Sequence, residues 1–164
     1  MTDPHTLQLF RGEVAVRPSV LFCGHCGSAP AETPPTEPES RVCRRCGMGL
    51  MLRAPADAAP SPSDPFLVVN GALTVCGMSR EAERLLDVEE TVAVNRHVGE
   101  FLAPADAETP TGENLAALLS WAVRGDAPPR CVCVRPANVF GVRYWARIGS
   151  CGPPRAALVV LADA

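Results

Sequence analysis

The chain has 164 residues, of which 47% are hydrophobic and 20% are charged, and its formal net charge is −3. A hydrophobic fraction of this size supports a packed core and excludes wholesale disorder, and the negative charge excludes a generally cationic nucleic-acid-binding protein. All 15 basic residues are arginines, so mechanisms that need a Schiff-base or P-loop lysine are excluded. Because no run of about 18 apolar residues and no secretory leader is present, we expect a cytoplasmic protein.

The N-terminal part contains two cysteine pairs. Cys23 and Cys26 form one C-x2-C motif, and Cys43 and Cys46 form a second after sixteen intervening residues. Two residues between cysteines allow one tight turn to direct both sulfurs at the same ion, so this spacing favours a tetrahedral, structural zinc site. A glycine follows each pair, at positions 27 and 47, where the chain must turn with a positive φ.

Other uses of the four cysteines are weaker interpretations. An iron–sulfur centre also takes four thiolates, whereas disulfides need an oxidising compartment, and a redox C-x-x-C motif is expected in a larger α/β unit. Four protein ligands leave no open coordination position, so catalytic zinc is not expected. His25, between the first two cysteines, is expected to be exposed rather than to be a fifth ligand.

Residues 18–53 resemble a zinc ribbon, with two cysteine knuckles and short strands expected at residues 20–22 and 50–52. Such units often bind proteins or nucleic acids. Arg44 and Arg45 lie in the second knuckle and are candidate partner contacts, with nucleic acid as a weaker alternative because arginines and acids are nearly balanced in this part.

Residues 54–65 read APADAAPSPSDP, with four prolines and no periodic apolar pattern. Proline fixes φ and removes a backbone donor, so this segment is predicted to be a semi-extended linker. It separates residues 1–53, the N-terminal segment and ribbon, from a second domain at residues 66–164.

The second part is predicted to alternate between strands and helices in a fixed order. A strand at residues 66–70 and a return strand at 73–77 flank an Asn-Gly turn, and Ser79 is expected to cap a helix over residues 80–86. One or two helical turns are expected within residues 89–101. Thr111 is expected to cap a further helix that ends at Gly125 and buries one stripe, formed by Leu115, Leu118, Leu119 and Ala122. Strands are expected at residues 131–135, 142–148 and 156–162.

This order, together with the segments FLVVNGALTVCGMSREAERLLDV, HVGEFLAP and NLAALLSWAVRGD, resembles a PAS domain over residues 64–163. The resemblance implies an α+β fold, in which a five-stranded antiparallel sheet carries its helices on one face and can enclose a small ligand. The expected fold is therefore a small zinc ribbon joined to a PAS-like domain. Candidate pocket residues are Phe101, Trp121, Tyr144, Ala146 and Ile148.

Two of the expected strands are apolar on both faces, at residues 66–69 and 156–162. Helices can cover only one face of the sheet, so a second protomer, the N-terminal segment or the ribbon must cover the other. We expect a homodimer through this outer face. The strand at 142–148 alternates, and its outward residues are candidate partner contacts: Arg143, Trp145 and Arg147.

Cofactors and catalysis are not indicated by the remaining residues. Flavin-binding PAS domains carry an Asn-Cys pair, whereas this chain has Asn95-Arg96 at the corresponding place. Haem needs an axial ligand, but the long helix has no histidine, and His97 is the single histidine of the second part. No catalytic motif is found, and no output module is expected after the last strand. We therefore expect a non-enzymatic signalling protein, with a redox sensor as an alternative that would use Cys76, Cys131, Cys133 or Cys151.

Overall fold

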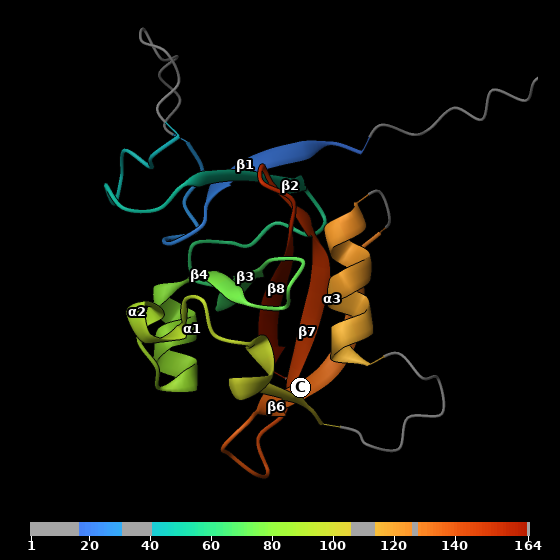
Figure 1. The fold of residues 1–164 in the computed structure, drawn as a ribbon. Helices are drawn as coiled ribbons and strands as arrows, with labels where there is room; N and C mark the ends of the chain where they lie inside the picture. Colours follow the sequence, from blue (N-terminus) through green and yellow to red (C-terminus); the bar gives the residue numbers. More distant parts are fainter. Residues whose placement is uncertain (1–16, 31–40, 106–113, 126–127, 164) are drawn as a thin grey trace, which may run out of the picture.

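The computed structural model describes residues 17–30, 41–105, 114–125 and 128–163. These ranges contain a two-stranded antiparallel sheet near the N-terminus and a larger antiparallel sheet with helices beside it (Figure 1). Within them, no helix is long and apolar enough to cross a membrane. The elements in chain order are β1 (Ser19–Cys23), β2 (Met51–Pro55), β3 (Phe66–Val69), β4 (Val75–Met78), α1 (Arg80–Leu86), α2 (Glu90–Ala93), the 3-10 helix η1 (Val98–Glu100), β5 (Leu102–Pro104), α3 (Leu115–Arg124), β6 (Arg130–Pro136), β7 (Tyr144–Cys151) and β8 (Ala156–Asp163).

The larger sheet has six strands in the order β4-β3-β8-β7-β6-β5, all in antiparallel pairs. The mixed α+β class and the antiparallel sheet confirm the expectation from sequence, but the expected number of five strands is wrong. The additional strand, β5, is three residues long and pairs with β6 at the edge of the sheet. So short a segment carries no alternating pattern, and its last residue is Pro104, which a sheet accepts at an edge.

The helices follow local signals in the sequence. The Ser79 side chain accepts a hydrogen bond from the backbone N–H of Ala82, which caps α1 as predicted. The four residues of the predicted stripe on α3 are all buried, and Gly125 ends the helix. The helix begins later than expected, because Asn114 caps it by accepting from the N–H of Ala117 at 2.7 Å. Thr111, the expected cap, lies outside the described residues.

The main core lies between the inner face of the large sheet and the helices. It joins buried residues of β3, β7 and β8 to residues from α1, α2, η1 and α3, among them Leu67, Ile148, Val159, Ala82 and Leu119. The alternation predicted for β7 is confirmed at Ala146 and Ile148, which are fully buried on this inner face.

A second hydrophobic cluster lies on the outer face of the same sheet. There Phe22, Leu52 and Ala54 of the β1–β2 sheet pack against apolar residues of β3, β7 and β8, which include Phe66 and Leu158. Figure 1 shows β1 and β2 lying across one end of these strands. Of the three covers that the sequence left open, the cysteine-containing unit occupies this part of the outer face.

Residues 54–65, predicted to be a linker, begin inside β2 with the buried Ala54 and then make turns in which Ala58 is buried. A Cβ on Gly149 of β7 would lie 2.6 Å from the Cβ of Ala58, so the segment passes close to the sheet backbone. The Arg147 guanidinium donates a hydrogen bond to the carbonyl of Ala59 at 3.2 Å. The domain boundaries at residues 53 and 66 remain predictions. The segment between them packs against β7 through Ala58 and Ala59.

Candidate metal centre

The structure brings together all four predicted ligands, whose sulfur atoms lie within 4.8 Å of one another. The Sγ atoms of Cys23 and Cys46 are 3.7 Å apart, those of Cys26 and Cys43 are 3.9 Å apart, and none of the four is in a disulfide. A tetrahedral zinc tetrathiolate with Zn–S bonds of about 2.3 Å places its sulfurs about 3.8 Å apart. The spacing of the thiols therefore fits a tetrahedral ion of this size.

Each cysteine pair lies in a tight turn with the predicted glycine. Gly27 and Gly47 have φ values of +68° and +70°, which confirms the expectation of left-handed backbone at both positions. The backbone N–H groups of His25 and Cys26 point at the Cys23 sulfur at 3.4 Å, and that of Gly49 points at the Cys46 sulfur at 3.4 Å. Such donors stabilise negative charge on sulfur, which is the form that binds a metal.

Gly49 was not identified from the sequence, although it allows the two knuckles to approach. A Cβ at this position would lie 2.3 Å from the Cys23 sulfur and 2.7 Å from the Cβ of His25. Real Cβ contacts do not reach such distances, so only glycine fits without moving the first knuckle. The sequence signal that could have identified Gly49 is the segment Gly-Met-Gly directly after Cys46, in which a second glycine follows the one expected in the turn.

The thiols of Cys23 and Cys46 differ in how readily they lose their protons. Burial raises the pKa of the Cys46 thiol, but the backbone donors at Gly49 and Met48 outweigh it and lower that pKa to about 6. Burial dominates at Cys23 and raises its pKa to about 12, although backbone N–H groups oppose the shift. Without a metal, the cluster thus keeps a proton on Cys23 while Cys46 ionises readily. A bound cation must displace that proton, so metal binding releases protons from the site.

His25 is buried, which corrects the expectation that it is exposed. Its Nδ1 atom lies 2.8 Å from Oε2 of Glu90, the first residue of α2. The other oxygen of the same carboxylate accepts a hydrogen bond from the backbone N–H of Met78 in β4 at 2.9 Å. One carboxylate therefore connects the first cysteine knuckle to the sheet. Glu90 is 65 residues from His25 in the chain, so no local pattern could predict the pair.

Backbone contacts also fix the cysteine module, defined here as residues 17–30 and 41–55, against the sheet. Arg53 of β2 exchanges two backbone hydrogen bonds with Gly152 in the turn between β7 and β8, at 2.7 and 3.0 Å. Gly77 of β4 faces the first knuckle, where an added Cβ would lie 3.3 Å from the carbonyl oxygen of Gly24. The module is thus hydrogen-bonded to the sheet at Gly152, and its first knuckle passes close to β4 at Gly77.

The predicted pocket residues lie in the main core on the other face of the sheet. Ala146 and Ile148 are fully buried, Phe101 is nearly so, and Trp121 and Tyr144 pack partly buried against the same cluster. The structure brings these five side chains to one core, and their role as ligand contacts stays a prediction.

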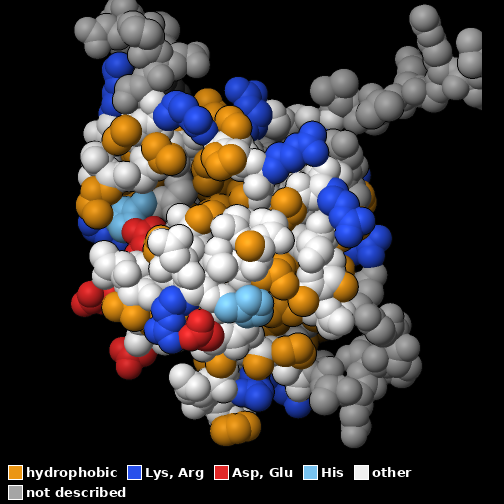
Figure 2. All heavy atoms as spheres, in the orientation of Figure 1, with side chains coloured by type: hydrophobic (Ala, Val, Ile, Leu, Met, Phe, Trp, Pro, Cys, Tyr) orange, Lys and Arg blue, Asp and Glu red, His pale blue; other side chains and the backbone are white. Residues whose placement is uncertain are grey.

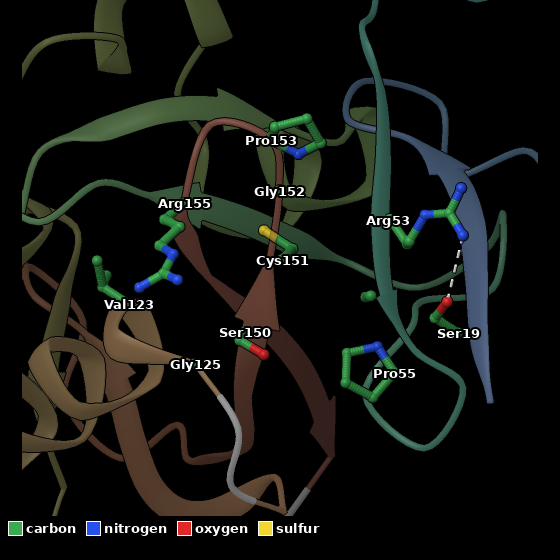
Figure 3. A pocket seen from close by; sticks show the side chains of 11 residues that line it. Ser19, Arg53, Pro55, Val123, Gly125, Ser150, Cys151, Gly152, Pro153 and Arg155 are labelled. Carbon is green, nitrogen blue, oxygen red and sulfur yellow. Dashed lines mark hydrogen bonds between the residues drawn. The ribbon is translucent and has the colours of Figure 1, made fainter. Parts of the chain in front are cut away.

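A cavity of about 310 Å³ opens at the junction of the module, the end of α3 and the β7–β8 turn. It contains none of the predicted pocket residues. The side chain of Arg53 donates a hydrogen bond to Ser19 (Figure 3). The side chain of Arg155 donates to the backbone carbonyl of Arg124 at 3.4 Å. Figure 3 shows these two guanidiniums on opposite sides of Cys151, turned away from each other. They therefore do not converge on one anion in this arrangement.

The predicted partner surfaces lie on separate parts of the molecule. Arg44 and Arg45 are exposed in the second knuckle, and Arg143 and Trp145 are exposed at β7, with Trp145 accessible over 49% of its surface. Arg147 is half-buried and is engaged with Ala59. The two groups therefore form two candidate surfaces.

The four remaining cysteines have no disulfide partner. Burial raises the pKa of Cys151 to about 12, with a smaller contribution from Cys76, and burial also raises the pKa of Cys76. Cys76 and Cys131 are exposed, whereas Cys133 and Cys151 are buried. At Cys151 the burial limits access and the raised pKa reduces the thiolate that reacts with oxidants, so this residue does not favour the redox-sensor alternative.

Comparison with known proteins gives little further information. No protein-family model matches the chain, and no curated protein matches it in sequence. A solved structure described as the PAS domain of an HTR-like protein from Haloarcula marismortui superposes with a TM-score of 0.45 and 13% identity, over 62% of this chain and 81% of that chain.

Proposed function

We propose that this chain is a non-enzymatic regulatory protein, in which a structural zinc ion folds the cysteine module and holds it on the outer face of a PAS-like domain. The observation that carries the proposal is the cluster of four thiols with tetrahedral spacing, in a module whose Phe22 and Leu52 complete a hydrophobic cluster with the sheet. A PAS-like assignment is supported by the element order and by the antiparallel sheet with helices on its inner face.

Zinc suits this donor set better than the alternatives. Four thiolates are soft ligands that complete a tetrahedral shell, so a bound ion has no open position for substrate and acts structurally. Within the proposal, Cys23, Cys26, Cys43 and Cys46 are the ligands. A module this small buries little apolar surface by itself, so the metal and the contact with the sheet supply much of its folding free energy. Free thiols suit a reducing compartment, which supports a cytoplasmic location.

Regulation in this proposal is exerted by binding rather than by catalysis. The PAS-like domain senses a small ligand through its inner core or dimerises through exposed sheet surface, and the metal-held knuckles bind a partner. The Glu90 carboxylate contacts Nδ1 of His25 and accepts a hydrogen bond from the N–H of Met78. These contacts join the module to α2 and β4 and give a change in the second domain a route to the first knuckle.

Native and denaturing mass spectrometry of the gently purified chain tests the proposal. We expect one zinc ion per chain in the native spectrum, and an additional small-molecule mass if the PAS-like domain holds a ligand. Substitution Cys43→Ser should abolish zinc retention and lower the thermal midpoint, whereas the matched substitution Cys131→Ser, at an exposed cysteine outside the cluster, should change neither. Retention of zinc by Cys43→Ser, or an iron–sulfur absorption spectrum, contradicts the zinc assignment.

A further inference from the structure

Three large apolar side chains are exposed on and beside the second knuckle, in a module whose Phe22, Leu52 and Ala54 are buried against the sheet and whose Val20 and Leu21 are exposed on β1. Met48 is accessible over 66% of its surface, Leu50 over 47% and Val42 over 41%. Val42 and Leu50 face each other in an antiparallel bridge, and the N–H of Cys43 donates to the carbonyl of Gly49 beside them. These three residues are called the knuckle patch below. Exposed apolar groups gathered in this way mark binding surfaces.

Arginines adjoin the knuckle patch and leave its charge unbalanced. Arg44 and Arg45 are exposed at the tip of the same knuckle, and neither forms an ion pair within the described residues. The described ranges 17–30 and 41–55 contain five arginines and no Asp or Glu. A zinc tetrathiolate would carry two net negative charges, which leaves the described residues of the module with three net positive charges. Arg17 pairs with Asp57 at 3.8 Å, and Glu32, Glu37 and Glu39 lie in the sequence between the two ranges, so the local excess of positive charge is the one at Arg44 and Arg45. Figure 2 shows hydrophobic side chains between arginines on the part of the molecule where Figure 1 places β1 and β2.

We propose that the knuckle patch and its two arginines form a docking surface for an acidic protein segment that carries apolar side chains. This inference rests on the proposed function, because the metal holds the knuckle in shape. The two features match the two parts of a protein interface, in which apolar anchors are buried at the centre and charged groups surround them, with Met and Arg enriched. Nucleic acid fits less well, since its surface offers phosphates to the arginines but little to three aliphatic side chains.

Fluorescence anisotropy with a labelled peptide, in which Asp and Glu alternate with Leu and Phe, tests the surface on the zinc-loaded full chain. We expect binding that weakens with added salt, and a loss of affinity of about tenfold or more in the double variant Arg44→Glu/Arg45→Glu. Met48→Gln should also weaken binding, but without changing its salt dependence. The matched controls are Arg80→Glu and Phe140→Gln, an exposed arginine and an exposed apolar residue elsewhere, and both should leave the affinity unchanged.

The zinc content of every variant is measured in parallel, so a failure of the docking surface is separated from a failure of the metal site. Absence of peptide binding by the zinc-loaded wild-type chain overturns the docking proposal and leaves the proposed function in place. Binding of duplex DNA that depends on Arg44 and Arg45 but not on Met48 overturns it in favour of nucleic acid.

Residues 31–40 contain three glutamates. A third outcome is that the peptide binds only after Glu32, Glu37 and Glu39 are changed to Gln. That result would mean that the chain's own acidic segment occupies the surface, and it would overturn the proposal of an external partner.

Discussion

The ring of Phe22 in β1 meets the ring of Phe66 in β3 edge to face, with centroids 5.8 Å apart and an interplanar angle of 86°. Both rings are buried, and they belong to parts of the chain separated by the two cysteine pairs. The pair therefore forms the centre of the contact between module and sheet. We therefore expect the folding of the cysteine module to depend on its contact with the large sheet as well as on the proposed metal.

Substitution Phe66→Ala is expected to lower the free energy of unfolding by about 3–5 kcal/mol, because it removes a fully buried ring and leaves a cavity between module and sheet. The affinity for zinc should fall as well, since the knuckle loses its support. Urea unfolding and a competitive zinc titration measure the two effects. Phe140→Ala, at a phenylalanine exposed over 82% of its surface, is the control and should change neither quantity appreciably. An unchanged zinc affinity in Phe66→Ala would show that the module folds without the sheet.

Substitution Gly49→Ala is expected to weaken zinc binding strongly, because the new methyl group would lie 2.3 Å from the Cys23 sulfur and force the knuckles apart. The measurement is competition for zinc with a chromophoric chelator. Gly71→Ala is the matched control, since an added Cβ there would meet its nearest neighbour, Val123, at an ordinary 3.6 Å. Equal zinc affinity in the Gly49 variant and the wild type would exclude the close approach seen in the structure.

The features that were predicted correctly from sequence are those that a few neighbouring residues determine. The two cysteine pairs with their glycines, the Ser79 cap and the buried stripe of α3 depend on spacing along one turn, and the structure contains all of them. The apolar outer faces of β3 and β8 also indicated correctly that something must cover them.

The features that were missed depend on residues distant in the chain. The exposure of His25 was predicted wrongly because its partner, Glu90, lies on another element, and a charged residue near a helix start gives no sign of such a contact. The cavity beside Cys151 forms where three separate segments meet, so its lining has no sequence signature. The edge strand β5 was missed because three residues are too few for a periodic pattern.

The link between His25 and Glu90 is expected to have a measurable coupling energy. A double-mutant cycle with His25→Ala, Glu90→Ala and the double variant should give a coupling of about 0.5–3 kcal/mol in urea unfolding, because the contact is buried and the carboxylate also accepts from Met78. The control cycle uses Arg96 and Glu100, an exposed pair whose coupling should be smaller because water competes for both groups. Additive effects of His25→Ala and Glu90→Ala would contradict the coupling.

Alkylation of the native chain with iodoacetamide is expected to distinguish the cysteines of the second domain. The thiolate is the reactive form, and the pKa of about 12 at Cys151 leaves roughly a thousandfold less thiolate at neutral pH than an ordinary cysteine has. Cys131 and Cys76 are exposed, and Cys131 should be modified first because the pKa of Cys76 is raised, while Cys151 should react much more slowly than either as long as the chain is folded. Peptide mapping by mass spectrometry after timed exposure measures these rates, and the Cys151 rate should rise about tenfold per pH unit as long as the fold persists. Rapid modification of Cys151 at neutral pH would contradict its burial beneath the module, and would restore the redox-sensor alternative for that residue.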